Sequence, residues 1–320
     1  MKPLILVLVG PTGTGKTELA IRLAKKFPIE VISADSMQLY QGLDIGTAKP
    51  TRTEQRRVKH HLIDLVPPSK NFSVYLFRKK ALVAIQNILK RGRTPVVVGG
   101  SGLYVRALLN GLTQYPKSVR GLRAKLEKDF KREGVSALYR RLKSLNGSYA
   151  EGIDPQNPRR VIRALEIALS AKSTASGKTT ELSSLKELGY EVKVLGISME
   201  RNKLYEQVEK RIDQMFRKGW LAEAKRLSKK RLSRTVKQAV GYRQIWESGL
   251  LARGTTKREE FKSVSDSVKL ATRHLVKKQF TWYRREPWIE WFDVTSPEGF
   301  RHAEIKIGEE LNRINLGRTG

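Results

Sequence analysis

The sequence predicts an α/β fold in which a parallel sheet is flanked by helices. Three observations predict it: short apolar runs are typical of buried strands, helical patterns alternate with these runs, and the first run leads directly into a glycine-rich turn. Alternating strands and helices favour a parallel sheet with helices on both faces. With 320 residues, the chain is long enough for one large domain or two smaller ones.

The apolar runs predict four strands. Residues 4–9 form a continuous aliphatic run, which suits a strand covered on both faces. Residues 30–33, 95–98 and 191–197 give the other three, and Gly99 and Gly100 end the third. Helices are expected at 73–90 and 201–218, because each stretch places its apolar residues on one stripe. In the second helix the stripe consists of Leu204, Val208, Ile212 and Met215.

The alternation stops between residues 115 and 190. This stretch has helical periodicity, no convincing strand and more Lys and Arg than Asp and Glu. It predicts a basic helical insertion between two strands of the sheet. The expected organisation is a first core part at 1–114, the insertion at 115–190, and core completion with a basic helical tail at 191–320. Residues 173–184 are rich in Ser and Thr, which predicts a loop.

The charge indicates a polyanionic partner. Lys and Arg total 63 against 31 Asp and Glu, a formal net charge of +32. Such an excess repels itself unless a polyanion offsets it, so we expect a nucleic acid first and an anionic membrane second. The absence of Cys excludes disulfides, thiolate metal sites and a Cys nucleophile. No run approaches the ~18 apolar residues of a membrane span. We therefore expect a cytoplasmic monomer without a membrane partner.

The glycine-rich turn fits the phosphate-loop pattern G-x-x-x-x-G-K-[ST]. It consists of Gly10, Pro11, Thr12, Gly13, Thr14, Gly15, Lys16 and Thr17. It follows a strand and precedes a helical pattern, which is the context that the pattern requires. Backbone N–H groups of such a loop close around an anion, Lys16 can reach phosphate oxygens, and Thr17 can offer its hydroxyl to Mg²⁺. The turn predicts a P-loop NTPase-like sheet. It does not identify the ligand, because ATP, GTP and a prenyl diphosphate all present a pyrophosphate group.

Three further residues are candidates for the chemistry. Asp35 directly follows the second strand, where ligands collect in α/β sheets, so it is a Mg²⁺ ligand, a general base or the cap of a turn. Ser101 lies in the turn that ends the third strand, near the same edge. Arg211 borders the apolar stripe of the helix at 201–218. A cation there is costly unless it faces an anion or extends to the solvent.

Several segments together resemble the signatures of the bacterial tRNA dimethylallyltransferases. They are SADSMQLYQGLDIGTAKP (33–50), HHLID (60–64), GGSGLY (99–104), DPQNPRRVIRALE (154–166), GYRQ (241–244) and KKQFTWYRR (277–285). With the phosphate loop, the matching segments run in order from residue 10 to residue 285. Long ordered matches are far more specific than the phosphate loop alone.

The resemblance implies a reaction and a role for each matching residue. A dimethylallyl group would pass from dimethylallyl diphosphate to N6 of the adenosine at tRNA position 37, next to the anticodon, with release of pyrophosphate. The loop from Gly10 to Thr17 would hold the diphosphate, with Mg²⁺ as cofactor. Asp35 would be the general base, Arg211 would neutralise the pyrophosphate, and Ser101, where the family more often has Thr, would complete the catalytic set. The residues implied in tRNA binding are Asp35, Ser36, Met37, Gln38, Ser101, Arg123, Arg159, Arg160, Val161, Ile162 and Arg163.

A basic helical face near the end of the chain adds to the expected tRNA surface. Lys269, Arg273 and Lys277 recur every four residues, and no acid occurs from 267 to 285. This pattern predicts contacts with RNA phosphates, and a plain solvated helix surface is the alternative. The adjacent His60 and His61 predict packing or hydrogen bonding rather than a metal site, because no third ligand is evident.

Three rival functions remain open at this point. A small-molecule P-loop kinase would explain the loop but not the charge. An adenylate prenyltransferase acting on free AMP would share the chemistry but would need no RNA-sized basic surface. A non-catalytic nucleic-acid-binding module would explain the charge but would leave Asp35 and Arg211 without a role.

Overall fold

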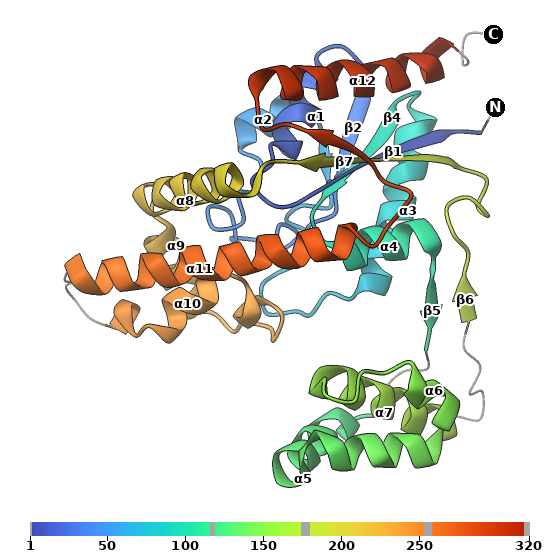
Figure 1. Ribbon diagram of the computed structural model, residues 1–320, viewed down its shortest axis with the longest axis vertical. Helices are drawn as coiled ribbons and strands as arrows, with labels where there is room; N and C mark the ends of the chain where they lie inside the picture. Colours follow the sequence, from blue (N-terminus) through green and yellow to red (C-terminus); the bar gives the residue numbers. More distant parts are fainter. Residues whose placement is uncertain (1, 116–118, 174–179, 253–257, 317–320) are drawn as a thin grey trace. The chain divides into compact units, whose positions relative to one another are not determined.

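A parallel sheet of six strands forms the core of the larger of two units (Figure 1). The structure is a computed structural model that describes residues 2–115, 119–173, 180–252 and 258–316. The strand order is β3-β2-β4-β1-β7-β8, and all neighbours are parallel. The strands are β1 Leu4–Val9, β2 Ile29–Ser33, β3 His60–His61, β4 Thr94–Gly99, β7 Glu191–Ser198 and β8 Glu290–Asp293. The predicted α/β class is confirmed.

The four predicted strands are confirmed as β1, β2, β4 and β7. The outer strands β3 and β8 are not among the predictions. β3 has only two residues, and β8 lies in a tail that the sequence analysis expects to be helical. Inner strands are covered on both faces and therefore read as continuous apolar runs. The edge strand β8, with the sequence EWFD, is exposed at both of its acidic ends and carries no such run.

Helices cover both faces of the sheet (Figure 1). β1 alternates its side chains: Leu6 and Leu8 pack towards α1 and α12, while Ile5 and Val7 pack towards α3, α4, α8 and α11. The helices of this unit are α1 Lys16–Ala24, α2 Arg52–Arg57, α3 Val74–Lys90, α4 Gly102–Asn110, α8 Arg201–Arg217, α9 Trp220–Ser228, α10 Tyr242–Glu247, α11 Arg258–Tyr283 and α12 Pro297–Leu316, with 3-10 turns η1 Val236–Gln238 and η2 Leu250–Ala252. The predicted stripe of α8 is buried throughout.

The second unit comprises Gly111–Leu182 and has its own apolar core. An antiparallel ribbon of β5 Leu112–Gln114 and β6 Thr180–Leu182 joins helices α5 Leu122–Leu145, α6 Gly147–Glu151 and α7 Pro158–Ser173 to the rest of the chain. The unit thus lies within 111–182, whereas the sequence analysis expects an insertion at 115–190. Leu185, beyond β6, packs in the core of the larger unit. Of the predicted loop at 173–184, residues 174–179 lie outside the described residues and 180–182 form β6.

None of the described helices is long and apolar enough to cross a membrane.

Candidate active site

The glycine-rich loop joins β1 to α1 at the carboxyl end of a central strand. Gly13 has φ +94°, and a Cβ there would lie 2.6 Å from the Val208 side chain of α8. Gly15 has φ +84° and caps the start of α1. Any other residue would be strained at these positions. The glycines therefore let the loop pack directly on α8 and lead its backbone into the start of α1.

Two cations converge on this loop. Lys16 is buried, and its ammonium donates to the Pro11 carbonyl of its own loop. Arg211, which is half-buried, donates from Nη2 to Thr12 Oγ1 at 2.7 Å, while its Nε has no hydrogen-bond partner in the described part of the chain. Burial and then the charge of Arg211 lower the pKa of Lys16 to about 7, and Asp35 opposes the shift. Burial also lowers the pKa of Arg211. Both groups would gain from an anion between them.

Asp35 and Ser101 lie at the carboxyl ends of neighbouring strands, β2 and β4. Asp35 Oδ1 accepts hydrogen bonds from the backbone N–H groups of Met37 (2.7 Å) and Gln38 (3.3 Å), so Asp35 does cap a turn. Its Oδ2 has no hydrogen bond within the described residues. Ser101 Oγ accepts from the backbone N–H of Ser36 at 3.1 Å. One carboxylate oxygen is therefore fixed by the turn, and the other remains available for chemistry.

Two adjacent cavities share Asp35, Arg211, Thr12, Thr47 and Gln279. The first, of about 330 Å³, is lined by the loop residues Gly13, Gly15, Lys16 and Thr17. The second, of about 250 Å³, has an apolar wall of Met37, Ile212, Met215, Trp220, Val240 and Leu275. The first cavity offers Lys16 and Arg211 to an anionic group, beside the acids Glu18 and Glu54. The second suits an apolar group or a base, and Asp35 lies at the boundary.

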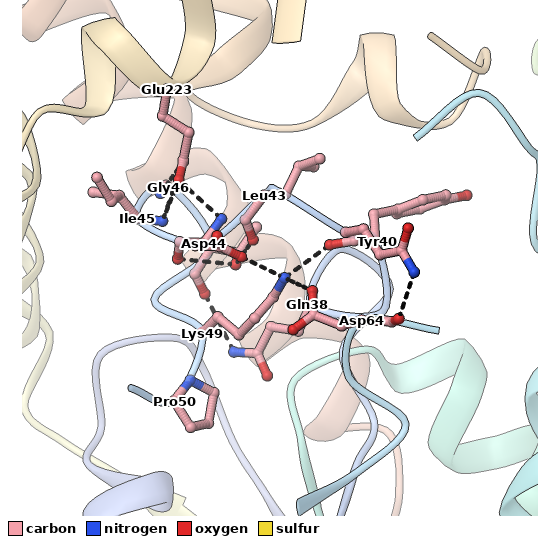
Figure 2. Close-up of polar contacts among 12 residues, drawn as sticks. Gln38, Tyr40, Leu43, Asp44, Ile45, Gly46, Lys49, Pro50, Asp64 and Glu223 are labelled. Carbon is pink, nitrogen blue, oxygen red and sulfur yellow. Dashed lines mark hydrogen bonds and ion pairs between the residues drawn. The ribbon is translucent and has the colours of Figure 1, made fainter. Parts of the chain in front are cut away.

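Residues 46–48 form a wall shared by both cavities, and Figure 2 shows the contacts that hold the segment around them. Glu223 of α9 is 1% exposed, and its carboxylate accepts from the backbone N–H groups of Asp44, Ile45 and Gly46 at 2.9 to 3.2 Å and from the Tyr242 hydroxyl. Lys49 pairs with Asp44 (2.7 Å) and Asp64 (2.6 Å) and donates to the Tyr40 carbonyl. Neither Glu223 nor Lys49 is among the site residues predicted from the sequence. A signal for Glu223 existed, because it shares the helical face of Trp220 and Leu227, where an acid needs partners.

Comparisons with known proteins show which family the chain belongs to. Residues 38–286 match the family described as IPP transferase, and residues 3–67 match the one described as isopentenyl transferase. The chain belongs to the IPP transferase family. It is 40% identical over 312 residues to a tRNA dimethylallyltransferase of Thermomicrobium roseum, covering 96% of this chain and 91% of that one. The family resemblance predicted from the sequence is confirmed.

Solved structures of the family share the fold. A full-length tRNA isopentenylpyrophosphate transferase from Bacillus halodurans is similar with a TM-score of 0.68 and 36% identity, and each chain is covered completely. A eukaryotic dimethylallyltransferase described as acting on tRNA is similar with a TM-score of 0.70 and 25% identity, over 92% of this chain and 74% of that one.

The basic face predicted on α11 is partly neutralised by α8. Lys269 pairs with Asp213 at 2.7 Å, and Arg273 pairs with Glu209 and lies over the Tyr205 ring. Lys277 is exposed and its side chain has no ion-pair partner among the described residues. The acids come from a helix about sixty residues earlier, so the run without acids in α11 does not reveal them. Of the three, Lys277 is the one without an ion-pair partner in the part of the chain that the structure describes.

The tRNA-binding residues implied in the second unit differ in exposure. Val161 and Ile162 are buried in its apolar core, so their side chains are not available to an RNA. Arg159 and Arg160 are exposed. Arg123 and Arg163 both pair with the buried Glu166, at 3.2 and 2.7 Å. Because α7 turns once every 3.6 residues, a run of five residues such as 159–163 includes both surface and core positions.

The described residues offer few side chains that could bind a metal ion. Within the described residues, no group of three or more His, Asp or Glu could hold an ion. His60 Nδ1 lies 2.9 Å from the Val58 carbonyl, and His61 Nε2 lies 2.6 Å from Glu30, so both histidines have structural partners. Thr17 lines the first cavity, and no hydrogen bond engages its hydroxyl in the described chain. Mg²⁺ is commonly held by one or two protein oxygens together with substrate phosphates, so this donor set fits.

Proposed function

We propose that this protein transfers a dimethylallyl group from dimethylallyl diphosphate to N6 of the adenosine at position 37 of tRNA. The observation that carries the proposal is the pair of adjacent cavities with Asp35 and Arg211 at their boundary. The first contains the glycine-rich loop with Lys16 and Arg211, two cations that a diphosphate would need, and the other has an apolar wall. Related proteins that bear the name tRNA dimethylallyltransferase support the same reaction.

Asp35 acts as the general base in this proposal. Adenine N6 is a poor nucleophile because its lone pair is delocalised into the ring, so it must lose a proton as it attacks. The turn fixes Asp35 Oδ1 through the N–H groups of Met37 and Gln38, which leaves Oδ2 to accept that proton. A carboxylate in this position typically contributes ~10²–10⁴ in rate.

The leaving diphosphate gains negative charge as the bond to the allylic carbon breaks. Lys16, Arg211 and the amides of the loop surround the first cavity and stabilise this charge. Thr17 would hold Mg²⁺ against the diphosphate, where the ion supplies further positive charge to the leaving group. In this proposal the leaving group and the acceptor therefore occupy two different, adjacent cavities.

The acceptor adenosine must leave its stack to reach the second cavity. Enzymes that act on bases spend a few kcal/mol on this step, and the cost is smallest for a base that is already in a loop. The net charge of +32 attracts the tRNA backbone, and the exposed cations Lys277, Arg159 and Arg160 are candidates for contact with it. Because a tRNA substrate is met in the cytoplasm, we propose that the protein acts there, as a monomer.

The test uses purified protein, Mg²⁺ and radiolabelled dimethylallyl diphosphate, with unmodified tRNA in one tube and free AMP in another. Label in tRNA alone is the expected result. Label in AMP would keep the chemistry and change the acceptor to that of an adenylate prenyltransferase. No label in either tube would contradict the proposal, and an ATP-turnover assay would then test the kinase alternative.

A further inference from the structure

Gln279 of α11 connects the two halves of the site. Its Oε1 accepts a hydrogen bond from the backbone N–H of Thr12 at 2.9 Å, and its Nε2 donates to the Gly100 carbonyl at 3.0 Å. The side chain also lines both cavities. Among the described residues, no other side chain is hydrogen-bonded both to the loop 10–17 and to the turn 99–102.

On one side, Gln279 holds Thr12, the residue whose hydroxyl is hydrogen-bonded to Arg211. Thr12 is engaged at two points: its amide donates to Gln279, and its hydroxyl accepts from Arg211 Nη2 at 2.7 Å. A displacement of Thr12 would therefore move the guanidinium as well. This half of the site contains the groups proposed to bind the leaving diphosphate.

On the other side, Gln279 holds the turn that supports Asp35. Ser101, next to Gly100, donates its backbone N–H to the Ala34 carbonyl at 3.3 Å and accepts from the Ser36 N–H at 3.1 Å. These two bonds secure the residues on either side of Asp35. This half of the site contains the proposed general base.

Two glycines of the turn 99–102 lie against α11 and leave room for the side chain that forms this bridge. A Cβ on Gly100 would lie 2.4 Å from Gln279 Nε2, and a Cβ on Gly102 would lie 2.2 Å from Trp282. Gln279 and Trp282 are three positions apart and so share a helix face. Two glycines thus leave room for two adjacent side chains of one long helix, and a rigid element carries the bridging amide.

We propose that Gln279 is a positioning residue that fixes the separation between the leaving diphosphate and Asp35. This inference rests on the proposed function. Transfer requires the attacking nitrogen and the allylic carbon to approach within about 3 to 3.5 Å in line, and a misplacement of about 1 Å can cost on the order of 10²-fold in rate. The sheet sets the two turns side by side, and Gln279 sets their final spacing.

The test compares Gln279→Met, which has a similar length but neither hydrogen bond, with Gln279→Asn, whose shorter amide cannot reach both partners. Gln86→Met, at an exposed position of α3, is the matched control. The measurements are the single-turnover rate of prenyl transfer at saturating substrates, the dissociation constants of tRNA and inorganic pyrophosphate, and the urea unfolding midpoint. Gln279→Asn carries the test if Gln279→Met fails to fold.

We expect the single-turnover rate of Gln279→Met to fall on the order of 10²-fold, with at least a tenfold loss for Gln279→Asn and none for the control. Both dissociation constants should stay within about threefold of wild type, because each half of the site remains intact. An unchanged rate in both variants would overturn the inference alone. A loss confined to either dissociation constant would assign Gln279 to binding and also overturn it. No transfer by the wild-type protein would overturn the proposed function and the inference with it.

Discussion

Arg211 donates to Thr12 Oγ1 at 2.7 Å, a contact between residues 199 positions apart that joins α8 to the loop after β1. Because Arg211 also lowers the pKa of Lys16, the two cations share one electrostatic environment. The arrangement is costly without an anion and favourable with one. The charge state of Lys16 should therefore depend on whether a diphosphate is bound.

The first prediction concerns pH. Burial, followed by Arg211, lowers the pKa of Lys16 to about 7 in the free protein, so above that pH Lys16 is mostly neutral. A bound diphosphate favours the ammonium and raises this pKa again, so binding takes up a proton. We expect the dissociation constant of inorganic pyrophosphate to rise by up to about tenfold per pH unit between about pH 7.5 and 9.

The control for this measurement is Lys16→Arg, whose guanidinium stays protonated over this range. The titration of pyrophosphate itself is common to both proteins and cancels in the ratio of their dissociation constants. A ratio that does not change with pH would contradict the prediction.

The second prediction separates the two roles of Asp35. Asp35→Asn keeps an oxygen for the N–H groups of Met37 and Gln38, so the turn survives, but it removes the base. We expect the single-turnover rate to fall by ~10²–10⁴, while tRNA affinity stays within about twofold. Filter binding and single-turnover assays on the same preparation check this. Equal losses of rate and affinity would mean that Asp35 serves RNA binding.

The third prediction concerns the wall held by Glu223. Glu223→Ala leaves the part-buried N–H groups of Asp44, Ile45 and Gly46 without their acceptor, and each such group costs about 1 kcal/mol, the low end of the range for buried groups. We expect the free energy of unfolding to fall by about 3 kcal/mol, and by less for Glu223→Gln, which keeps one acceptor oxygen.

Equilibrium urea unfolding measures this loss, with Glu247→Ala as the control. Glu247 is exposed on α10 and pairs with the exposed Arg243, so its removal should cost about 0–1 kcal/mol. A loss for Glu223→Ala no larger than that of the control would show that the loop does not depend on the carboxylate.

The fourth prediction distinguishes two lysines of α11. Lys277 is exposed and has no ion-pair partner among the described residues, whereas Lys269 is already paired with Asp213 at 2.7 Å. We expect Lys277→Ala to weaken tRNA binding and to reduce the slope of log affinity against log salt by about 1, as the loss of one phosphate contact does. Lys269→Ala should change the slope less. Equal slopes for both variants would mean that the pair with Asp213 opens when RNA binds.

Much of the fold could be predicted because its signals are local. The inner strands β1, β4 and β7 are covered on both faces and therefore read as apolar runs, and the period of α8 marks its buried stripe. The edge strands β3 and β8 lack that signal. The ribbon of β5 and β6 pairs two short segments far apart in the chain, so its residues carry little local indication of a strand.

Much of the candidate site could also be predicted, but the hydrogen bonds and ion pairs that connect its residues could not. Asp35, Ser101 and Arg211 follow from strand ends, a glycine turn and a cation beside an apolar stripe. The bridge made by Gln279 could not be predicted, because both of its partners are backbone groups of distant turns. The partners of Lys269 and Arg273 lie on α8, so the sequence of α11 alone suggests more free charge than the surface offers.

The parallel α/β sheet, the glycine-rich turn and the family could be predicted without a structure, because strand burial, helical period and motif spacing depend on neighbouring residues. Three features became visible only in the folded chain: the core position of Val161 and Ile162, the contacts of Glu223 with the wall of both cavities, and the bridge that Gln279 makes between their two halves. These facts depend on which surfaces meet when the chain folds. The hydrogen-bond partners that distant segments supply leave no periodic pattern in the sequence.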